Sequence, residues 1–202
     1  MAEIVTIFPT HELVSFDQQN IVYMFELFKK SSKGAKVIDK VWLSQQAKWN
    51  ACVQMVKLDP SILLVAWFEE TFLEIARNPG LAQNVIKADN ISYDKTVGRI
   101  VVFAEHYPLV LVEENAFSKL QLREVPVLSS LEEPLFMQFG GQNTIDVIRK
   151  LTSNEDEIIS HSLVTKSIRR AQESIAAKSG TDYLAGSAKE WFTLNFKEKK
   201  QS

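Results

Sequence analysis

The chain of 202 residues carries 23 basic and 25 acidic residues, and 46% of its residues are hydrophobic. A formal net charge of −2 is not the strongly basic balance of a nucleic-acid-binding protein, and the composition is typical of one soluble globular domain with room for a helical appendage. The single cysteine, Cys52, excludes an intramolecular disulfide and a cysteine cluster for zinc.

Strand-like and helix-like segments alternate along the first two thirds of the chain. The spacing of apolar residues predicts strands at residues 4–8, 36–43, 61–68, 84–91, 98–104 and 124–128, and helices at 17–30, 44–58, 69–78 and 112–121. Ser44 is expected to cap the second helix. The strand at 61–68 is apolar without interruption, which is typical of burial on both faces, whereas Pro126 indicates an edge strand.

The last third of the chain predicts helices without strands, at residues 131–140, 144–151, 159–175 and 187–196. Alternating strands and helices favour an α/β fold, a mostly parallel sheet flanked by helices in three layers, as in RecA-like and Rossmann-like proteins. We therefore expect an α/β domain at residues 1–151 and a C-terminal helical extension packed on it at 152–202. No signal peptide and no apolar run of ~18 residues is visible, which predicts a cytoplasmic protein without a membrane span.

One stretch near the C-terminus has a distinctive pattern: a Phe-Gly step, a helix ending in Lys-Leu, an acidic turn, and a second helix. The residues that carry it are Phe139, Gly140, Lys150, Leu151, residues 155–157, His161, Val164, Thr165, Lys166, Ala171 and Gln172. This pattern resembles the SecA preprotein-translocase motor ATPases, where their second RecA-like domain, of superfamily 2 helicase type, enters a helical scaffold. The segment SLEEPLF from Ser130 is similar to the same family, and a looser likeness extends over residues 48–78 and 98–106.

The ATPase motifs of that family are missing from this chain. No G-x-x-x-x-G-K-[ST] loop is present, and the only double glycine, Gly140-Gly141, precedes Gln142. Residues 107–128 stand where the family has its arginine-finger run. The resemblance therefore implies a degenerate scaffold without nucleotide hydrolysis and without a nucleotide cofactor.

The best candidate for chemistry is Glu105-His106-Tyr107, directly after the strand that we expect at the centre of the sheet. Ligands of open α/β sheets bind at the carboxyl ends of the strands, and a carboxylate beside an imidazole can perform acid–base catalysis near neutral pH. Glu105 and His106 are therefore the catalytic candidates, with Tyr107 as a ligand-binding candidate. The alternative is that the turn serves only structure.

His11 and Glu12 follow the first predicted strand and form a second pair of ligand-binding candidates. They and Glu105-His106 have no recognised metal-ligand spacing, so no metal site is predicted. His161 is interpreted as packing beside a helix cap, Cys52 as a core residue and Gly140-Gly141 as a hinge or cap. Four aromatic side chains, Trp42, Trp49, Trp67 and Phe103, are interpreted as core.

Several functions remain open. The first is a non-catalytic binding or regulatory protein that acts through an unidentified protein partner or self-association, with an exposed apolar patch that involves Trp191 and Phe192. The second is a small enzyme or ligand-binding protein that uses Glu105 and His106, and a third is completion of a nucleotide site beside a separate ATPase. Nucleic-acid binding through Lys166, Arg169 and Arg170 ranks last. Because no nucleotide-hydrolysis motif is present, the sequence argues against an enzyme more than for one. It does not identify the partner.

Overall fold

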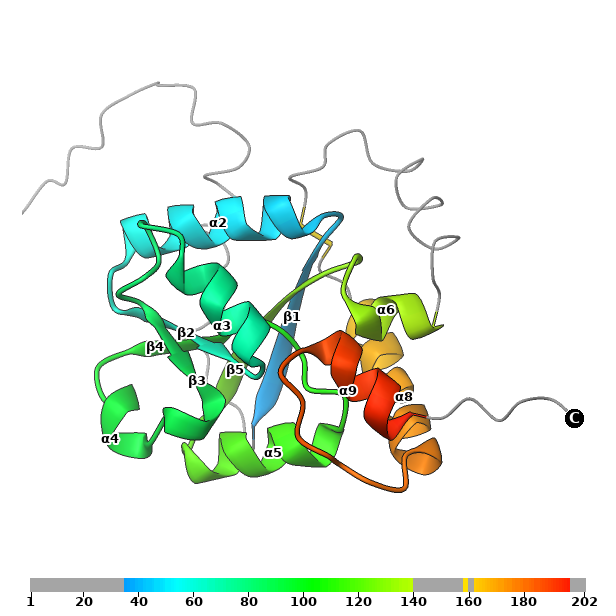
Figure 1. The fold of residues 1–202 in the computed structure, drawn as a ribbon. Coiled ribbons are helices and arrows are strands. Elements are labelled where there is room, and N and C mark those ends of the chain that lie inside the picture. Colours follow the sequence, from blue (N-terminus) through cyan, green and yellow to red (C-terminus); the bar gives the residue numbers. More distant parts are fainter. Residues whose placement is uncertain (1–34, 140–157, 160–161, 197–202) are drawn as a thin grey trace, which may run out of the picture.

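The computed structural model describes residues 35–139, 158–159 and 162–196 (Figure 1). The segments expected at residues 4–8, 17–30 and 144–151 lie outside this part. The described elements are β1 (Lys36–Trp42), α2 (Gln45–Leu58), β2 (Ile62–Ala66), α3 (Glu69–Ala76), β3 (Val85–Lys87), the 3-10 turn η1 (Ala88–Asn90), α4 (Tyr93–Thr96), β4 (Ile100–Phe103), α5 (Val110–Lys119), β5 (Glu124–Ser130), α6 (Pro134–Phe139), α8 (Ser162–Lys178) and α9 (Ala188–Asn195).

The strands form one five-stranded sheet in the order β1-β5-β4-β2-β3, and every pair of neighbours is parallel. This confirms the predicted α/β class with a parallel sheet. β4 is the middle strand, as expected for the strand before Glu105, and all five residues of β2 are buried. Because all five strands run in the same direction, their carboxyl ends meet at one edge of the sheet.

The prediction that Pro126 marks an edge strand is wrong, because β5 lies between β1 and β4. β5 pairs with β1 from Lys36↔Glu124 to Trp42↔Ser130, and Pro126 is opposite Ile38 in that ladder. Its pairing with β4 is limited to Phe103↔Val127. Proline has no backbone N–H to donate. β5 tolerates it inside the sheet because the short pairing with β4 uses few of the N–H groups of β5.

Helices cover both faces of the sheet, which gives three layers (Figure 1). On one face, α2 and α3 pack onto the sheet through Cys52, Met55 and Ile75. The predicted cap of α2 is confirmed, since the Ala47 N–H donates to Ser44 Oγ at 3.2 Å. On the other face α5 packs through Phe117, whose ring meets Phe103 edge-on at 4.9 Å between centroids.

The C-terminal helices build a third apolar cluster beside β1. α8 contacts β1 and α5, while α6 contacts α8 and α9. The cluster joins Val41 and Leu43 of the β1 segment to Ile175 of α8 and to Trp191 of α9. The boundary expected between residues 151 and 152 falls outside the described residues, so the division into a domain and an extension remains a prediction.

The expectation that Trp191 and Phe192 form an exposed patch is wrong. Trp191 is 0% exposed and Phe192 is 8% exposed, because both point from α9 into this cluster. The exposed apolar side chains near the C-terminus are instead Tyr183 (62%) and Leu184 (90%), in the segment between α8 and α9, and Leu194 (43%) on α9. Within the described residues, none of the helices has the length and apolar character that crossing a bilayer requires.

Candidate functional site

Glu105 joins the end of β4 to the start of α3. Its carboxylate accepts hydrogen bonds from the backbone N–H groups of Trp67 (3.0 Å) and Phe68 (3.1 Å) and from the hydroxyl of Thr71 (2.7 Å). Burial raises the pKa of Glu105 to about 7, although the Thr71 hydrogen bond opposes the shift. The carboxylate therefore holds the β2–α3 turn in place and titrates near neutral pH.

His106 lies between two carboxylates, one from the sheet and one from a helix. Its Nε2 is 2.8 Å from Asp39 Oδ1 on β1, and its Nδ1 is 2.9 Å from Glu113 Oε1 on α5. Since a carboxylate accepts but does not donate, both ring nitrogens must carry protons, and the imidazole is a cation. Burial alone would lower the pKa of His106, but Glu113 and Asp39 outweigh it and raise the pKa to about 10.

The C-terminal helices complete this buried network. The Gln172 amide of α8 donates to the Tyr107 carbonyl (2.8 Å) and to Glu113 Oε2 (2.9 Å), and the Tyr107 N–H donates to Glu113 Oε1 (2.8 Å). The Tyr107 hydroxyl and the Trp191 indole both donate to Asp182 Oδ1, each at 2.7 Å. Strand ends that would otherwise face solvent are thus tied to α5, α8 and α9.

A small cavity of about 200 Å³ adjoins Glu105 and His106. Its acidic lining includes Glu70, Glu132 and Glu133. Beside it, the buried Lys48 ammonium donates to Glu133 Oε1 (2.5 Å) and to the Ala104 carbonyl (2.9 Å). We call this space the Glu105 cavity; the two buried cations at it, Lys48 and His106, are both paired with carboxylates, and four glutamates besides Glu105 line it.

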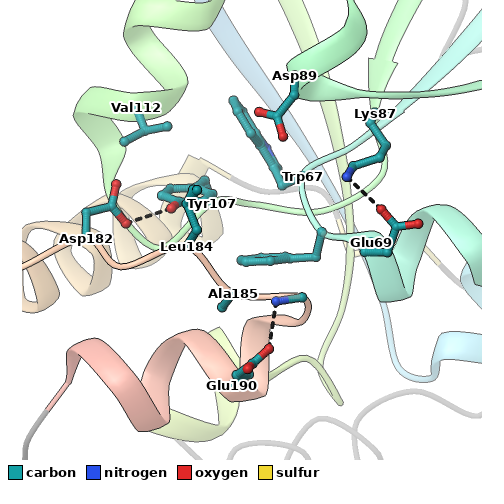
Figure 2. A pocket seen from close by; sticks show the side chains of 12 residues that line it. Trp67, Glu69, Lys87, Asp89, Tyr107, Val112, Asp182, Leu184, Ala185 and Glu190 are labelled. Atoms are coloured by element: carbon teal, nitrogen blue, oxygen red, sulfur yellow. Dashed lines mark hydrogen bonds and ion pairs between the residues drawn. The ribbon is translucent and has the colours of Figure 1, made fainter.

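A larger cavity of about 470 Å³ lies at the same edge of the sheet, outside the ends of β2, β3 and β4 (Figure 2). We call it the aromatic cavity and define it by Trp67, Glu69, Lys87, Asp89, Tyr107, Asp182, Leu184 and Glu190. The only side-chain ion pair drawn across it joins Lys87 to Glu69 at 2.6 Å. The segment between α8 and α9 closes one side, so the cavity exists only because that segment packs here.

The structure brings Glu105, His106 and Tyr107 together at the edge that the sequence predicts. The His106 side chain is 2% exposed and both its nitrogens are occupied, which leaves neither for a substrate. Glu105 is also buried, with three internal donors. The catalytic role of these residues remains a prediction.

Of the other candidates for chemistry, only Cys52 lies within the described residues. His11, Glu12, His161 and Gly140-Gly141 lie outside the described residues. Cys52 is buried in α2, and burial raises the pKa of its thiol to about 12, which is the behaviour of a core residue. Within residues 35–139, 158–159 and 162–196, no three His, Cys, Asp or Glu side chains are arranged so that they could hold a metal ion together.

The basic residues of α8 are also partly neutralised. Arg169 pairs with Glu114 (2.7 Å) and with Glu173 (3.0 Å). Burial opposes but does not outweigh these carboxylates, and the Glu114 hydrogen bond contributes most to raising the pKa of Arg169. A guanidinium held by two carboxylates presents less free positive charge to a nucleic acid.

Sequence reasoning missed four residues of the network: Asp39, Glu113, Gln172 and Asp182. Asp39 had the clearest signal in the sequence, because a carboxylate interrupts the apolar strand VIDKVW. In the structure this side chain is only 4% exposed. Glu113 is 2% exposed on a helix that otherwise buries apolar side chains. A charged residue at a core position predicts an internal partner, but the pattern does not say which one.

Fold and site together define a parallel three-layer α/β protein whose strand ends are closed by C-terminal helices. Over 46 residues, 23% of this chain, the sequence is 46% identical to the protein translocase subunit SecA of Chlorobium phaeobacteroides, and 48% identical to that of Chloroherpeton thalassium. The SecA of Chlorobaculum tepidum is 46% identical over the same length. Each match spans 4% of the relative's length, and no family model matches the chain. The local identity and the parallel sheet fit a SecA-like α/β domain.

The charge state of His106 predicts a pH-dependent stability. Its folded pKa of about 10 lies above the ordinary value of 6.5, so the folded state holds a proton that the unfolded state releases as pH rises. The stabilisation is fully present below about pH 6.5 and is lost towards pH 10. We expect the free energy of unfolding to fall by about 1.4 kcal/mol per pH unit between about pH 7 and pH 9. Urea unfolding at fixed ionic strength measures it, and a flat profile would contradict the imidazolium assignment.

Proposed function

We propose that this chain is a non-catalytic binding or regulatory protein built on a SecA-like α/β scaffold, acting on an unidentified protein partner or on a second copy of itself. The observation that carries the proposal is the state of the strand ends. There the groups capable of chemistry, Glu105, His106 and Lys48, are all buried and all committed to internal hydrogen bonds.

The charge at this edge also opposes nucleotide binding. The helix that follows β2 begins with Glu69 and Glu70, so carboxylates occupy the helix N-terminus at which phosphates bind in other α/β proteins. Glu132 and Glu133 follow β5 in the same way. A triphosphate at this edge would be repelled by carboxylates on both sides of the central strand. The chain also lacks the glycine loop that binds phosphates.

Thermal unfolding with and without nucleotides tests this proposal. We expect ATP, ADP and GTP, each with magnesium, to leave the melting temperature of the full chain unchanged. A ligand at a hundred times its dissociation constant would stabilise the protein by about 2.7 kcal/mol, a shift of a few degrees for a domain of this size. Magnesium alone is the control. A nucleotide-dependent shift, or phosphate release above the buffer rate, would overturn the proposal.

The alternative is a small enzyme or ligand-binding protein that uses the Glu105 cavity. It is favoured by one observation: Glu105 borders a cavity and its pKa is raised to about 7, a value suited to acid–base catalysis. Titration of the His106 ring by NMR tests the part that this ring would take in such catalysis. A general base near neutral pH requires an apparent pKa between about 6 and 8. The binding function expects the ring to stay protonated above pH 9.

A further inference from the structure

The aromatic cavity at the carboxyl edge has the size of a ligand site. Its volume of about 470 Å³ falls within the ~300–1,000 Å³ of small-molecule pockets. It is formed by segments far apart in sequence, which include the end of β2, the end of β3 and the α8–α9 segment (Figure 2). The cavity is separate from the Asp39–His106–Glu113 bridge. Tyr107 links them, because it lines the cavity and its backbone N–H donates to Glu113.

The lining of the aromatic cavity carries more negative than positive charge. Lys87 supplies its only ammonium group, and that group is paired with Glu69. Three further carboxylates, those of Asp89, Asp182 and Glu190, lie around the cavity in Figure 2. Asp182 and Glu190 accept hydrogen bonds only from neutral groups among the described residues, so their charges are not cancelled.

An aromatic wall lies beside these carboxylates. The Trp67 ring stacks on Phe103 at 5.1 Å between centroids and meets the Tyr107 ring at 5.3 Å with the planes tilted by 57°, which fixes its orientation. Trp67 is partly exposed, whereas Tyr107 is buried, so the indole is the aromatic surface that a ligand meets first. A rigid indole face attracts cations through its ring quadrupole, more strongly than phenylalanine or tyrosine does.

From this combination we propose that the aromatic cavity binds an organic cation, a guanidinium or alkylammonium group, against Trp67 and the carboxylates of Asp89, Asp182 and Glu190. The same chemistry is carried by free amines and by arginine or lysine side chains of a peptide. The proposal rests on the binding function proposed above and assigns its ligand class. An anionic ligand would be repelled by the same three carboxylates, since Lys87 already has a partner.

Titration of the full chain with three probes, followed by ¹H–¹⁵N NMR of the tryptophan indoles, tests the proposal. The probes are L-argininamide, the peptide acetyl-Gly-Arg-Gly-amide, and succinate as an anion of similar size. We expect both cations to move the Trp67 indole signal, with a dissociation constant of about a millimolar or lower, and succinate to leave it in place. Binding by L-argininamide points to a free amine as the ligand, and tighter binding by the peptide points to a basic segment.

Two matched variants distinguish a local effect of the cavity carboxylates on the cation from the effect of the protein's overall negative charge. Asp89→Asn removes an exposed carboxylate of the cavity, and Asp94→Asn removes an exposed carboxylate of α4 that does not line it. We expect Asp89→Asn to weaken cation binding about fivefold and Asp94→Asn to leave it within about twofold. Equal effects of the two variants, no saturable shift with either cation, or equally tight succinate binding would each overturn the proposal.

Failure here is distinguishable from failure of the proposed function, because the two tests have different readouts. A protein that binds no cation and is not stabilised by nucleotides keeps its non-catalytic assignment and loses only the ligand class. A protein stabilised by ATP loses the proposed function even if the Trp67 signal responds to argininamide.

Discussion

Replacing His106 by alanine is expected to destabilise the protein by about 3–5 kcal/mol, because two buried carboxylates would lose the cation between them. Asp39 is 4% exposed and Glu113 is 2% exposed, so water cannot replace the imidazolium without opening the structure. Glu113 would keep the Gln172 amide and the Tyr107 N–H, but both donors are neutral. Urea unfolding at about pH 7 measures the loss as a lower midpoint at unchanged slope.

The matched control for this variant is Glu114→Gln, one residue from Glu113 on α5. Glu114 is 46% exposed and pairs with Arg169 at the surface, so its replacement should cost no more than about 1 kcal/mol. If His106→Ala fails to fold, the double variant Asp39→Asn/Glu113→Gln offers the same test. It retains His106 but removes both charges, and the ring should then titrate far below pH 10. A loss below about 1 kcal/mol for His106→Ala would contradict the buried ion cluster.

Much of the fold follows from local pattern. The alternation of strands with helices predicted the parallel sheet, the continuous apolar run predicted the burial of β2, and Ser44 was predicted as the cap of α2. The position of β5 was not predictable in the same way. Pro126 normally marks an edge. What places β5 inside is its long ladder with β1, and β1 precedes it by more than eighty residues. This pairing is a long-range contact, and no local sequence pattern predicts it.

The candidate site was also predictable only in part. Its location after β4 was predictable, because ligands and polar turns gather at the carboxyl ends of parallel strands. Its electrostatics were not. Near neutral pH a solvent-exposed His106 would act as a base, whereas two carboxylates from β1 and α5 raise its pKa to about 10 and keep it a cation at that pH. The two partners come from β1 and α5, which meet the segment after β4 only in the folded chain.

The C-terminal helices illustrate why exposure was misjudged. The alternation of polar and apolar residues in α9 shows that one face is apolar, but not whether that face meets solvent, a partner or the chain itself. Trp191 meets the chain itself, through a cluster that includes α8 and the segment after β4. The exposed apolar side chains of the segment before α9 are Tyr183 and Leu184, and Leu184 lines the aromatic cavity.

Replacing Trp191 by alanine is expected to cost about 3–5 kcal/mol, since the side chain is 0% exposed and its removal leaves a large void. The indole also donates to Asp182 (2.7 Å) and meets the Tyr107 ring edge-on at 6.1 Å. Leu194→Ala on the same helix is the control; Leu194 is 43% exposed, so its loss should stay within about 0.5 kcal/mol. Trp191→Phe keeps most of the ring and removes the donor, and it should cost about 1–2 kcal/mol.

The same variants test whether α9 belongs to the folded unit or is a separable appendage. If the helix is integral, Trp191→Ala lowers the urea midpoint of a single transition, because the network from Asp182 through Tyr107 to the sheet loses its anchor. If α9 is separable, Trp191→Ala and Leu194→Ala give the same midpoint. In that case the main transition is unchanged and only a local, low-stability opening responds. The burial of Trp191 and its bond to Asp182 favour the first outcome, and we then expect the walls of the aromatic cavity to unfold together with the sheet.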